Sequence, residues 1–323
     1  MPKYWMVTNR TIVKGGLGRD PGPLSYFVAD QGPLDDFSNW HKVVGGGKTA
    51  AARFQDLLAG AADKFPLIED AALHEYEKHV SIFIHGYNND WADAASRYES
   101  ICRKIFESAD LGICVLFSWP SDGMKLGYLP DRMDAEKTAP ALSEVLNALY
   151  DWMEQKQVKS AADPTKTCKA KTSIIAHSMG NYVMQKAMQY TWTQKNQPLL
   201  VSLVNQLLMV AADVDNDLFR GGEAITKSDG DAIANLAYRV TALYTGRDPV
   251  LGLSAGFKHF GKRRLGRSGL DGAVPDNVWH VDCSTRIEQN AEDIHSCYFD
   301  QPGTIALMQQ ILRGVDRHVI MQG

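Results

Sequence analysis

One serine in this sequence lies where it could act as a nucleophile, on a sharp turn between a predicted strand and a predicted helix. Residues 172–176 are mostly β-branched or apolar, which is typical of a buried strand. From Asn181 onward the apolar residues recur with a helical period. Ser178 lies between them, with Gly180 two positions later and Ala176, in place of the usual glycine, two positions earlier. This arrangement predicts a nucleophile elbow; the alternative is that Ser178 only caps the helix.

A serine at its ordinary pKa is a weak nucleophile and needs a base. The sequence contains nine histidines. Around an elbow of this kind the expected chain order is serine, then acid, then histidine. His295 alone falls after the last predicted strand and before the final predicted helix, so we expect it to be the base. His177 adjoins the serine, but neighbouring side chains on a tight turn point apart.

Two aspartates compete to orient this histidine, a role that fixes its tautomer and stabilises the imidazolium. Asp248 follows the predicted strand at 240–245, which is the usual place for the acid. Asp213 follows the predicted strand one earlier, a less common position, and could instead cap a helix. We favour Asp248 and keep Asp213 as the alternative acid.

Acyl transfer also needs donors for a developing oxyanion. One is expected to be the backbone N–H of Met179, directly after the serine. The other is expected from Tyr87, because Gly86 lets the turn after the strand at 80–84 approach closely. The alternative is a plain turn in which Asn88 or Asp90 caps the next helix. We assign His85, Asn88 and Trp119, which lie near these ends, to substrate binding. The alternative for His85, which directly precedes Gly86, is that it shapes the turn.

A basic insertion at about 251–277 separates the strand before Asp248 from the last predicted strand. Its cationic residues are Lys258, Lys262, Arg263, Arg264 and Arg267. We expect this segment at the rim of the site, with Arg263 and Arg264 binding an anionic part of the substrate. The alternative is a solvated loop whose arginines pair with carboxylates such as Asp131 and Asp134.

Strands alternate with helices along the chain, which predicts an α/β fold with a mostly parallel sheet and helices on both faces. The predicted strands are 4–8, 80–88, 113–120, 172–176, 205–212, 240–245 and 278–283. The predicted helices are 49–60, 90–108, 138–155, 181–193 and 304–313. We expect one domain over 1–323, with an irregular N-terminal segment at about 9–48 and the inserted loop.

Composition restricts partners and compartment. Of 323 residues, 45% are hydrophobic and 22% charged, which is typical of a globular chain. The formal net charge of −4 gives no reason to expect nucleic acid or an anionic membrane as partner. No stretch predicts a membrane span or a secretory signal, and the five cysteines show no C-x-x-C spacing. We therefore expect a cytoplasmic protein with reduced thiols and without a metal or cofactor; the oligomeric state is open.

Three motifs taken in order resemble one group of proteins. They are Phe83-Ile84-His85-Gly86-Tyr87-Asn88, Phe117-Ser118-Trp119-Pro120-Ser121 and Ala176-His177-Ser178-Met179-Gly180-Asn181. The likeness continues through Tyr128, Asp131, Asp213, Asp248 and the run Arg264-Leu265-Gly266, and weakly includes Asn9-Arg10. The chain resembles the α/β-hydrolase family named domain of unknown function 900. This resemblance implies the α/β-hydrolase fold with Ser178, Asp248 and His295 as a triad, and little about substrate.

These residues favour a serine hydrolase that acts on a small-molecule carboxylic ester or thioester through an acyl-enzyme. An acyltransferase would use the same triad with an acceptor alcohol in place of water. A non-catalytic binding protein that retains the hydrolase fold is the alternative from another class. Reaction of Ser178 with a fluorophosphonate probe separates the enzymes from the binding protein.

Overall fold

A single sheet organises the protein in the computed structural model, which describes residues 2–71, 75–87, 89–121, 128–162, 170–194, 202–220, 230–258 and 261–322. Its strands are β1 (Tyr4–Val13), β2 (Gly16–Ala29), β3 (His41–Lys42), β4 (Ile68–Asp70), β5 (Glu75–Ile84), β6 (Ile113–Ser118), β7 (Ala170–His177), β8 (Val204–Val210), β9 (Ala237–Tyr244) and β10 (Val278–Asp282). They follow the order β10–β9–β8–β7–β5–β6–β1–β2–β3, with β4 paired to β5. From β10 to β1 every neighbouring pair is parallel, which confirms the predicted α/β fold with a mostly parallel sheet.

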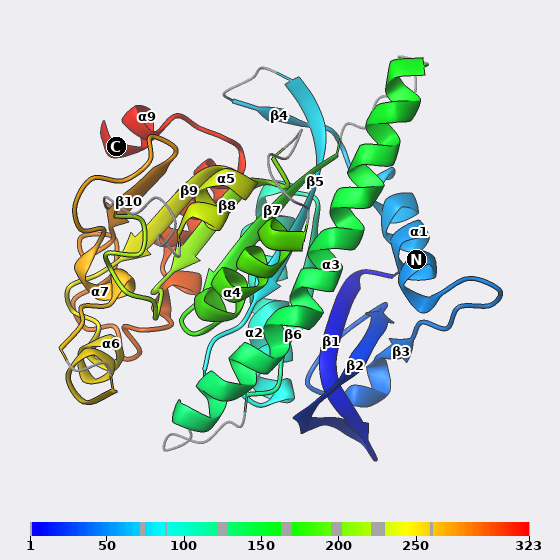
Figure 1. The fold of residues 1–323 in the computed structure, drawn as a ribbon, viewed down its shortest axis with the longest axis horizontal. Coiled ribbons are helices and arrows are strands. Elements are labelled where there is room, and N and C mark those ends of the chain that lie inside the picture. The colour runs from blue at the N-terminus through cyan, green and yellow to red at the C-terminus, as the bar shows by residue number, and fades with distance from the viewer. Residues whose placement is uncertain are drawn as a thin grey trace.

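Helices cover both faces of this sheet (Figure 1). They are α1 (Ala50–Ala62), α2 (Trp91–Ile101), α3 (Tyr128–Ala162), α4 (Gly180–Gln194), α5 (Asp231–Leu236), α6 (Pro249–Leu253), α7 (Leu265–Ser268), α8 (Pro302–Leu312) and α9 (Arg317–Gln322). Apolar side chains of α1, α3, α4 and α5 pack into one core on the face toward the viewer. Those of α2, α8 and α9 pack into a second core behind the sheet. Because both faces are covered, every residue of the central strands β6 and β8 is buried, and β6 is apolar from Ile113 to Phe117.

The parallel strands bring their carboxyl ends to one edge of the sheet. β5 is paired on one side with β6 and on the other with β7, so that Ile84 lies opposite Phe117 and Ala176. β7, β8 and β9 continue in register, with Ala176 opposite Met209 and Met209 opposite Ala242. Segments that follow β5, β6, β7, β8 and β9 therefore converge, and open α/β sheets place their sites at this edge.

The prediction that residues 9–48 are irregular is wrong for much of this segment, because β1 and β2 occupy that part. β1 continues to Val13, turns through Gly15 with a φ of 82°, and returns antiparallel as β2. The glycines and prolines of β2 suggested a loop, but prolines are tolerated in a strand near the edge of a sheet. Arg10 lies opposite Pro21, between two shifts in the pairing register. The hairpin is therefore a regular pair of strands that is interrupted by bulges.

Two further elements differ from expectation. Helix α3 begins at Tyr128 rather than at Thr138, so that Pro140 lies inside it and not near its start. The inserted segment at 251–277 is not a simple loop, because α6 ends within it and α7 lies inside it. Among the described helices, none combines the length and the apolar character that crossing a bilayer requires.

The cysteine prediction can be checked at four positions. Cys102, Cys114, Cys283 and Cys297 are buried free thiols. Cys168 lies outside the described residues.

Candidate active site at the carboxyl edge of the sheet

Ser178 lies on the tight turn between β7 and α4, as the sequence predicts. Its φ of 51° is left-handed, a conformation that costs a residue with a side chain about 1–3 kcal/mol. Hydrogen bonds hold this turn: the Ser178 N–H donates to Val210 O at 3.0 Å, and the Asp213 N–H donates to Ser178 O at 3.2 Å. The Asn181 side chain also donates Nδ2 to Ala176 O at 2.8 Å and to Ser178 O at 3.2 Å. The strain is thus imposed by the end of β8 and by one buried amide.

Small residues on each side of Ser178 are required by close packing. A Cβ on Gly180 would lie 2.4 Å from His85 O and 2.7 Å from Ile84 O, so only glycine fits there. On the other side the Ala176 methyl is fully buried in the core without displacing the strand pairing, which explains why alanine replaces the usual glycine.

Three side chains from distant parts of the chain form one hydrogen-bonded row. The Ser178 Oγ lies 2.8 Å from His295 Nε2. His295 Nδ1 lies 2.7 Å from Asp248 Oδ2. All three residues are buried, with 3%, 8% and 0% of their surfaces exposed, respectively. The structure therefore brings together the serine, histidine and first-choice aspartate that chain order suggested.

Asp248 is held by the backbone around it. It is the N-cap of α6, and its Oδ1 accepts the Leu251 N–H at 3.0 Å. Its backbone carbonyl accepts a hydrogen bond from Arg267 of the inserted segment. With one carboxylate oxygen engaged by the helix, the other is left for His295 Nδ1.

His177, adjacent to the serine, fixes the backbone at His295. Its ring nitrogen Nε2 lies 3.0 Å from His295 O, and because a carbonyl can only accept, Nε2 carries the proton. Burial, with the nearby His295 ring, lowers the pKa of His177 well below its ordinary value, so it stays neutral. The sequence argument that His177 points away from the serine missed this positioning contact, because the carbonyl lies 118 residues later in the chain.

The pKa of His295 reflects two opposing effects. Burial lowers it, but the hydrogen bond that His295 donates to Asp248 and the negative charge of Asp248 raise it, with smaller contributions from Asp213 and Asp293. The balance raises the pKa of His295 above its ordinary value of 6.5. A carboxylate beside His295 Nδ1 therefore favours the imidazolium form of this ring over the neutral form.

The turn after β5 touches the serine. A Cβ on Gly86 would lie 2.8 Å from Ser178 Cβ and 2.9 Å from His177 Nδ1. This glycine lets the backbone that continues into Tyr87 approach the hydroxyl. On the other side, the Met179 N–H donates to no protein acceptor in the described part of the chain. The two amides named from the sequence thus belong to segments that border Ser178.

His85 and Trp119 hold this turn and do not face a substrate, so their assignment to substrate binding is wrong. They are 1% and 0% exposed, and their rings stack with centroids 5.3 Å apart. The Trp119 N–H donates to His85 Nε2 at 3.0 Å, so Nδ1 carries the proton and donates to Gly86 O at 2.9 Å. Burial and the charge of Arg10 lower the pKa of His85 to about 3, which keeps this tautomer neutral. Asn88 lies outside the described residues.

A buried arginine from the first strand joins the turns that follow β5 and β6. Arg10, 1% exposed, donates Nη2 to Asn89 O at 3.1 Å. Its Nε donates to Ser118 Oγ at 3.1 Å, and its Nη1 donates to Ser121 O at 3.3 Å. Sequence reasoning missed this role because Arg10 follows the predicted strand at 4–8; its one signal was that Asn9-Arg10 belongs to the family resemblance. Arg10 therefore helps to fix the segment that carries Gly86.

Asp213, the alternative acid, belongs to a different network. Its Oδ1 accepts Arg264 Nε at 2.8 Å and Ser254 Oγ at 3.0 Å. Arg264 also pairs with Asp215 and is 1% exposed, so its assignment to substrate binding is wrong. An arginine buried with two aspartates cannot reach a ligand in solvent. The buried pair instead anchors the inserted segment to the end of β8.

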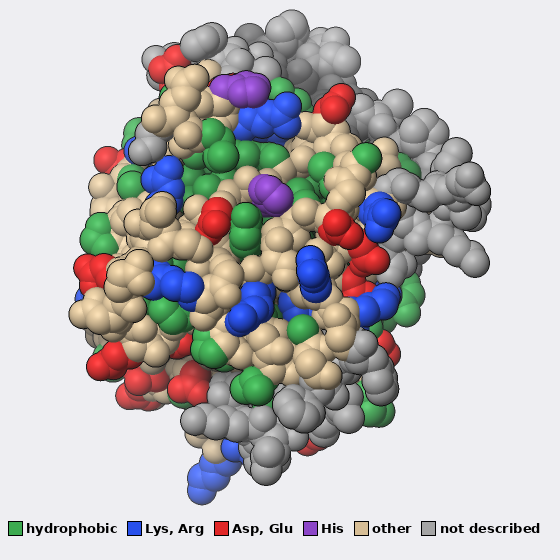
Figure 2. All heavy atoms as spheres, turned by 90° about the vertical axis from the view of Figure 1, so that its left-hand side faces the viewer, with side chains coloured by type: hydrophobic (Ala, Val, Ile, Leu, Met, Phe, Trp, Pro, Cys, Tyr) green, Lys and Arg blue, Asp and Glu red, His purple; other side chains and the backbone are tan. Residues whose placement is uncertain are grey.

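The remaining cations of the insertion lie at the surface. Arg263 is exposed, and Lys262 pairs with Asp215 at 3.1 Å. Asp134 pairs with Lys137 rather than with the insertion, and the side chains of Asp131 and Lys258 lie outside the described residues. Figure 2 shows Lys and Arg side chains spread across the face that includes β10 and the insertion. Arg263 is thus the residue of the predicted pair that can still meet an anionic substrate.

Comparisons with known proteins place this geometry in a family. Residues 66–271 match the model of the family described as alpha/beta hydrolase of unknown function (DUF900). The uncharacterized protein alr1448 of Nostoc sp. is 24% identical, with 74% of each chain covered.

Solved structures include similar folds at low sequence identity. An esterase of Pyrobaculum calidifontis is 11% identical, with 82% of this chain and 89% of that chain covered and a TM-score of 0.36. Phospholipase PlaB of Legionella pneumophila is 14% identical, with 76% of this chain and 60% of that chain covered and a TM-score of 0.41. The family model spans most of the chain, and the sheet order and the left-handed serine are those expected of an α/β hydrolase. This protein therefore belongs to the DUF900 family of α/β hydrolases.

Proposed function

We propose that the protein is a serine hydrolase of carboxylic esters or thioesters that works through an acyl-enzyme. The observation that carries this proposal is the row of hydrogen bonds from Ser178 Oγ through His295 to Asp248, built on a serine with a left-handed backbone. This row meets the geometric requirement that the nucleophile, its base and the orienting acid lie within hydrogen-bond reach.

In the acylation step, Ser178 Oγ attacks the carbonyl carbon of the ester while His295 Nε2 takes its proton, across the 2.8 Å contact. Nδ1–H of His295 donates to Asp248, which fixes the tautomer and stabilises the imidazolium that forms. The carbonyl π pair moves to oxygen, and the backbone amides of Met179 and Tyr87 stabilise that oxyanion.

The tetrahedral intermediate then collapses. The C–O bond to the alcohol, or the C–S bond to the thiol, breaks, and the leaving group takes the proton from His295 Nε2. Water repeats the sequence on the acyl-enzyme: His295 removes its proton, the oxygen attacks the acyl carbon, and Ser178 leaves with the proton returned. Each oxyanion-hole donor contributes on the order of 10²–10³ in kcat in enzymes of this kind.

Strain and burial support these roles. The left-handed turn at Ser178 is maintained by β8 and Asn181, and strain of this kind is concentrated at functional sites. The raised pKa of His295 reflects an Asp248 carboxylate that favours the imidazolium, which is the form His295 takes during acylation.

The test is a panel of nitrophenyl esters with graded acyl length, combined with a fluorophosphonate probe. We expect saturable hydrolysis of at least one ester, and mass spectrometry should place a single phosphonate on the peptide that contains Ser178. Absence of both hydrolysis and labelling in folded protein would instead favour a binding protein that kept the hydrolase fold.

A further inference from the structure

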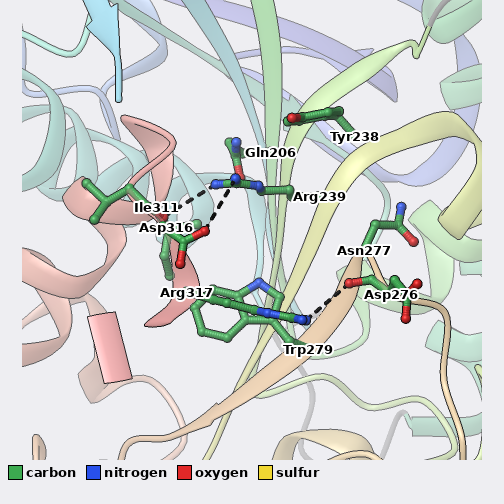
Figure 3. A pocket seen from close by; sticks show the side chains of 10 residues that line it. Gln206, Tyr238, Arg239, Asp276, Asn277, Trp279, Ile311, Asp316 and Arg317 are labelled. Carbon is green, nitrogen blue, oxygen red and sulfur yellow. Dashed lines mark hydrogen bonds and ion pairs between the residues drawn. The ribbon is translucent and has the colours of Figure 1, made fainter. Parts of the chain in front are cut away.

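A cavity lies at the amino-terminal edge of the parallel strands, whereas Ser178 lies at their carboxyl edge. It has a volume of about 280 Å³ and lies among the amino-terminal parts of β8, β9 and β10 and the segment from α8 to α9 (Figure 3). Arg239 lines it near the start of β9, whereas Asp248 follows the end of that strand. Gln206 of this cavity precedes Val210, whose carbonyl accepts the Ser178 N–H, by four residues of β8. At about 3.3 Å per residue, the cavity is roughly 15 Å from the serine site.

A buried side chain in this cavity has an unused donor. Gln206 is 1% exposed, and its Nε2 has no hydrogen-bond partner in the described part of the chain. Buried amide donors are almost always paired, because losing water without a replacement costs free energy. Gln206 and Arg239 are neighbours across β8 and β9, so their side chains emerge on the same face of the sheet. The unpaired amide therefore points to an acceptor that the protein itself does not supply.

Arg239 provides a second, partly used donor group beside it. Its Nη1 donates to Gly314 O at 2.9 Å and to Val315 O at 3.4 Å, which fixes the guanidinium. Its Nη2 lies 4.0 Å from Asp316 Oδ2, the outer limit of an ion pair, and that carboxylate is half exposed. The Arg239 side chain is only 22% exposed, so a ligand anion there would be largely shielded from water.

The other residues that line the cavity indicate what kind of ligand would fit it. The Trp279 ring is partly buried and lies across the cavity from Gln206 in Figure 3. Arg317 is anchored on Asp276 O at 3.1 Å. The two arginines and two aspartates of the lining balance in formal charge, so the lining has no net positive charge that would attract a polyanion. Its volume is at the small end for ligand sites, which restricts the ligand to about one ring.

We propose that this cavity is a binding site for a small aromatic carboxylate, separate from the hydrolase site. One carboxylate oxygen accepts from Gln206 Nε2, the other accepts from Arg239 Nη2, and the ring packs against Trp279. Binding involves no covalent step and does not depend on the reaction proposed at Ser178.

Isothermal titration of the full chain with benzoate tests this site. We expect one saturable site on wild-type protein and an equal affinity after Ser178 has been blocked by a fluorophosphonate or replaced by alanine. Benzamide, which keeps the ring and removes the charge, should bind at least about tenfold more weakly, because hydrogen bonds to a charged group are the stronger ones.

Two variants locate the binding. Gln206→Leu removes the donor at nearly constant volume and should weaken benzoate at least about tenfold, while its thermal midpoint stays equal or rises as an unpaired group is lost. Arg239→Lys keeps the charge, removes the planar fork and should also weaken binding. Gln289→Leu, at an exposed glutamine outside the cavity, is the matched control and should bind as wild type.

Three results would overturn the proposal: no saturable benzoate binding to folded wild-type protein, unchanged affinity in both Gln206→Leu and Arg239→Lys, or competition by the Ser178 phosphonate. If Gln206→Leu fails to fold, Arg239→Lys and the benzamide comparison decide the question.

Discussion

Gly86 and Ser178 are in such close contact that a methyl group on the glycine would lie 2.8 Å from Ser178 Cβ. Real Cβ atoms essentially never approach that closely, so either the turn after β5 or the serine must move. In the proposed reaction this turn supplies the Tyr87 amide to the oxyanion.

We therefore expect Gly86→Ala to lower kcat for a nitrophenyl ester on the order of 10²–10³, the effect of losing one oxyanion donor. Gly246→Ala is the matched control, because a Cβ at that glycine, two residues before Asp248, meets no atom within 4 Å. Wild-type kcat in Gly86→Ala would exclude this turn from the oxyanion hole.

Ser178→Ala is expected to abolish ester hydrolysis, since a triad nucleophile contributes on the order of 10⁶ in kcat. The fold should be nearly unaffected, because the turn is held by the backbone bonds to Val210 and Asp213 and not by the hydroxyl. Initial rates and phosphonate labelling measure the loss, and circular dichroism checks the fold. Activity above about a tenth of wild type would assign the nucleophile elsewhere.

Replacing Asp248 should mainly lower activity, whereas replacing Asp213 should mainly lower stability. Asp248→Asn leaves shape nearly unchanged but favours the wrong His295 tautomer, so we expect kcat to fall on the order of 10⁴. Asp213→Asn should mainly lower stability, because Arg264 is 1% exposed and loses one of its two carboxylate partners. Breaking a buried ion pair completely costs about 3–5 kcal/mol of unfolding free energy. The loss in Asp213→Asn should be smaller, since Arg264 keeps Asp215 as a partner.

Activity and urea unfolding of both variants, measured side by side, check this assignment. The reverse outcome, with Asp213→Asn inactive and stable and Asp248→Asn active, would make Asp213 the orienting acid.

The pH dependence of kcat/KM follows from the direction of the His295 pKa. The base must be neutral, and its pKa is raised above 6.5, so activity should fall as pH falls through a midpoint above 6.5. Asp248 supplies the largest of the effects that raise this pKa, so the midpoint of the residual activity in Asp248→Asn should move to lower pH. A wild-type midpoint below 6.5, or no movement in the variant, would contradict His295 as the titrating base.

Arg263 should affect anionic substrates only. It is exposed in the insertion, and Arg263→Ala is expected to raise KM for an ester with a negatively charged acyl group while leaving a neutral ester unchanged. The effect should shrink with added salt, because exposed charges are screened over about 10 Å at 0.1 M. Lys262→Ala, which removes a neighbouring cation already paired with Asp215, is the control. Equal changes for both esters would show that Arg263 only supports the loop.

The sequence was sufficient where a local pattern determines local structure. The apolar strand and helical period around Ser178 predicted the elbow, and chain order singled out His295 before any distance was known. The sequence could not separate Asp248 from Asp213 firmly, because both follow strands. Two long-range contacts distinguish them: His295 Nδ1 lies against Asp248, and Asp213 pairs with the buried Arg264. That pair also explains why Arg264 was misassigned: a cation in a glycine-rich segment looks exposed until its partner is seen.

Long-range contacts account for the other differences. Arg10 and His177 act on backbone groups 79 and 118 residues away, respectively, and no spacing in the sequence encodes such contacts. A position near the end of a strand suggests substrate contact for His85 and Trp119, but their stacked rings are buried and hold the turn. The full extent of the N-terminal hairpin could not be predicted, because its glycines and prolines suggest a loop but are tolerated near a sheet edge, where fewer neighbours constrain the strand.

The positions of Arg10 and His295 have a consequence for fragments of this protein. Ser178 and Asp248 lie inside residues 66–271, the part shared with the family model, whereas Arg10 precedes that part and His295 follows it. A polypeptide trimmed to the shared part would retain the proposed nucleophile and acid but would lack both the proposed base and the arginine that holds the neighbouring turn. Dividing the gene at the family boundaries would thus separate residues that the proposed reaction requires together.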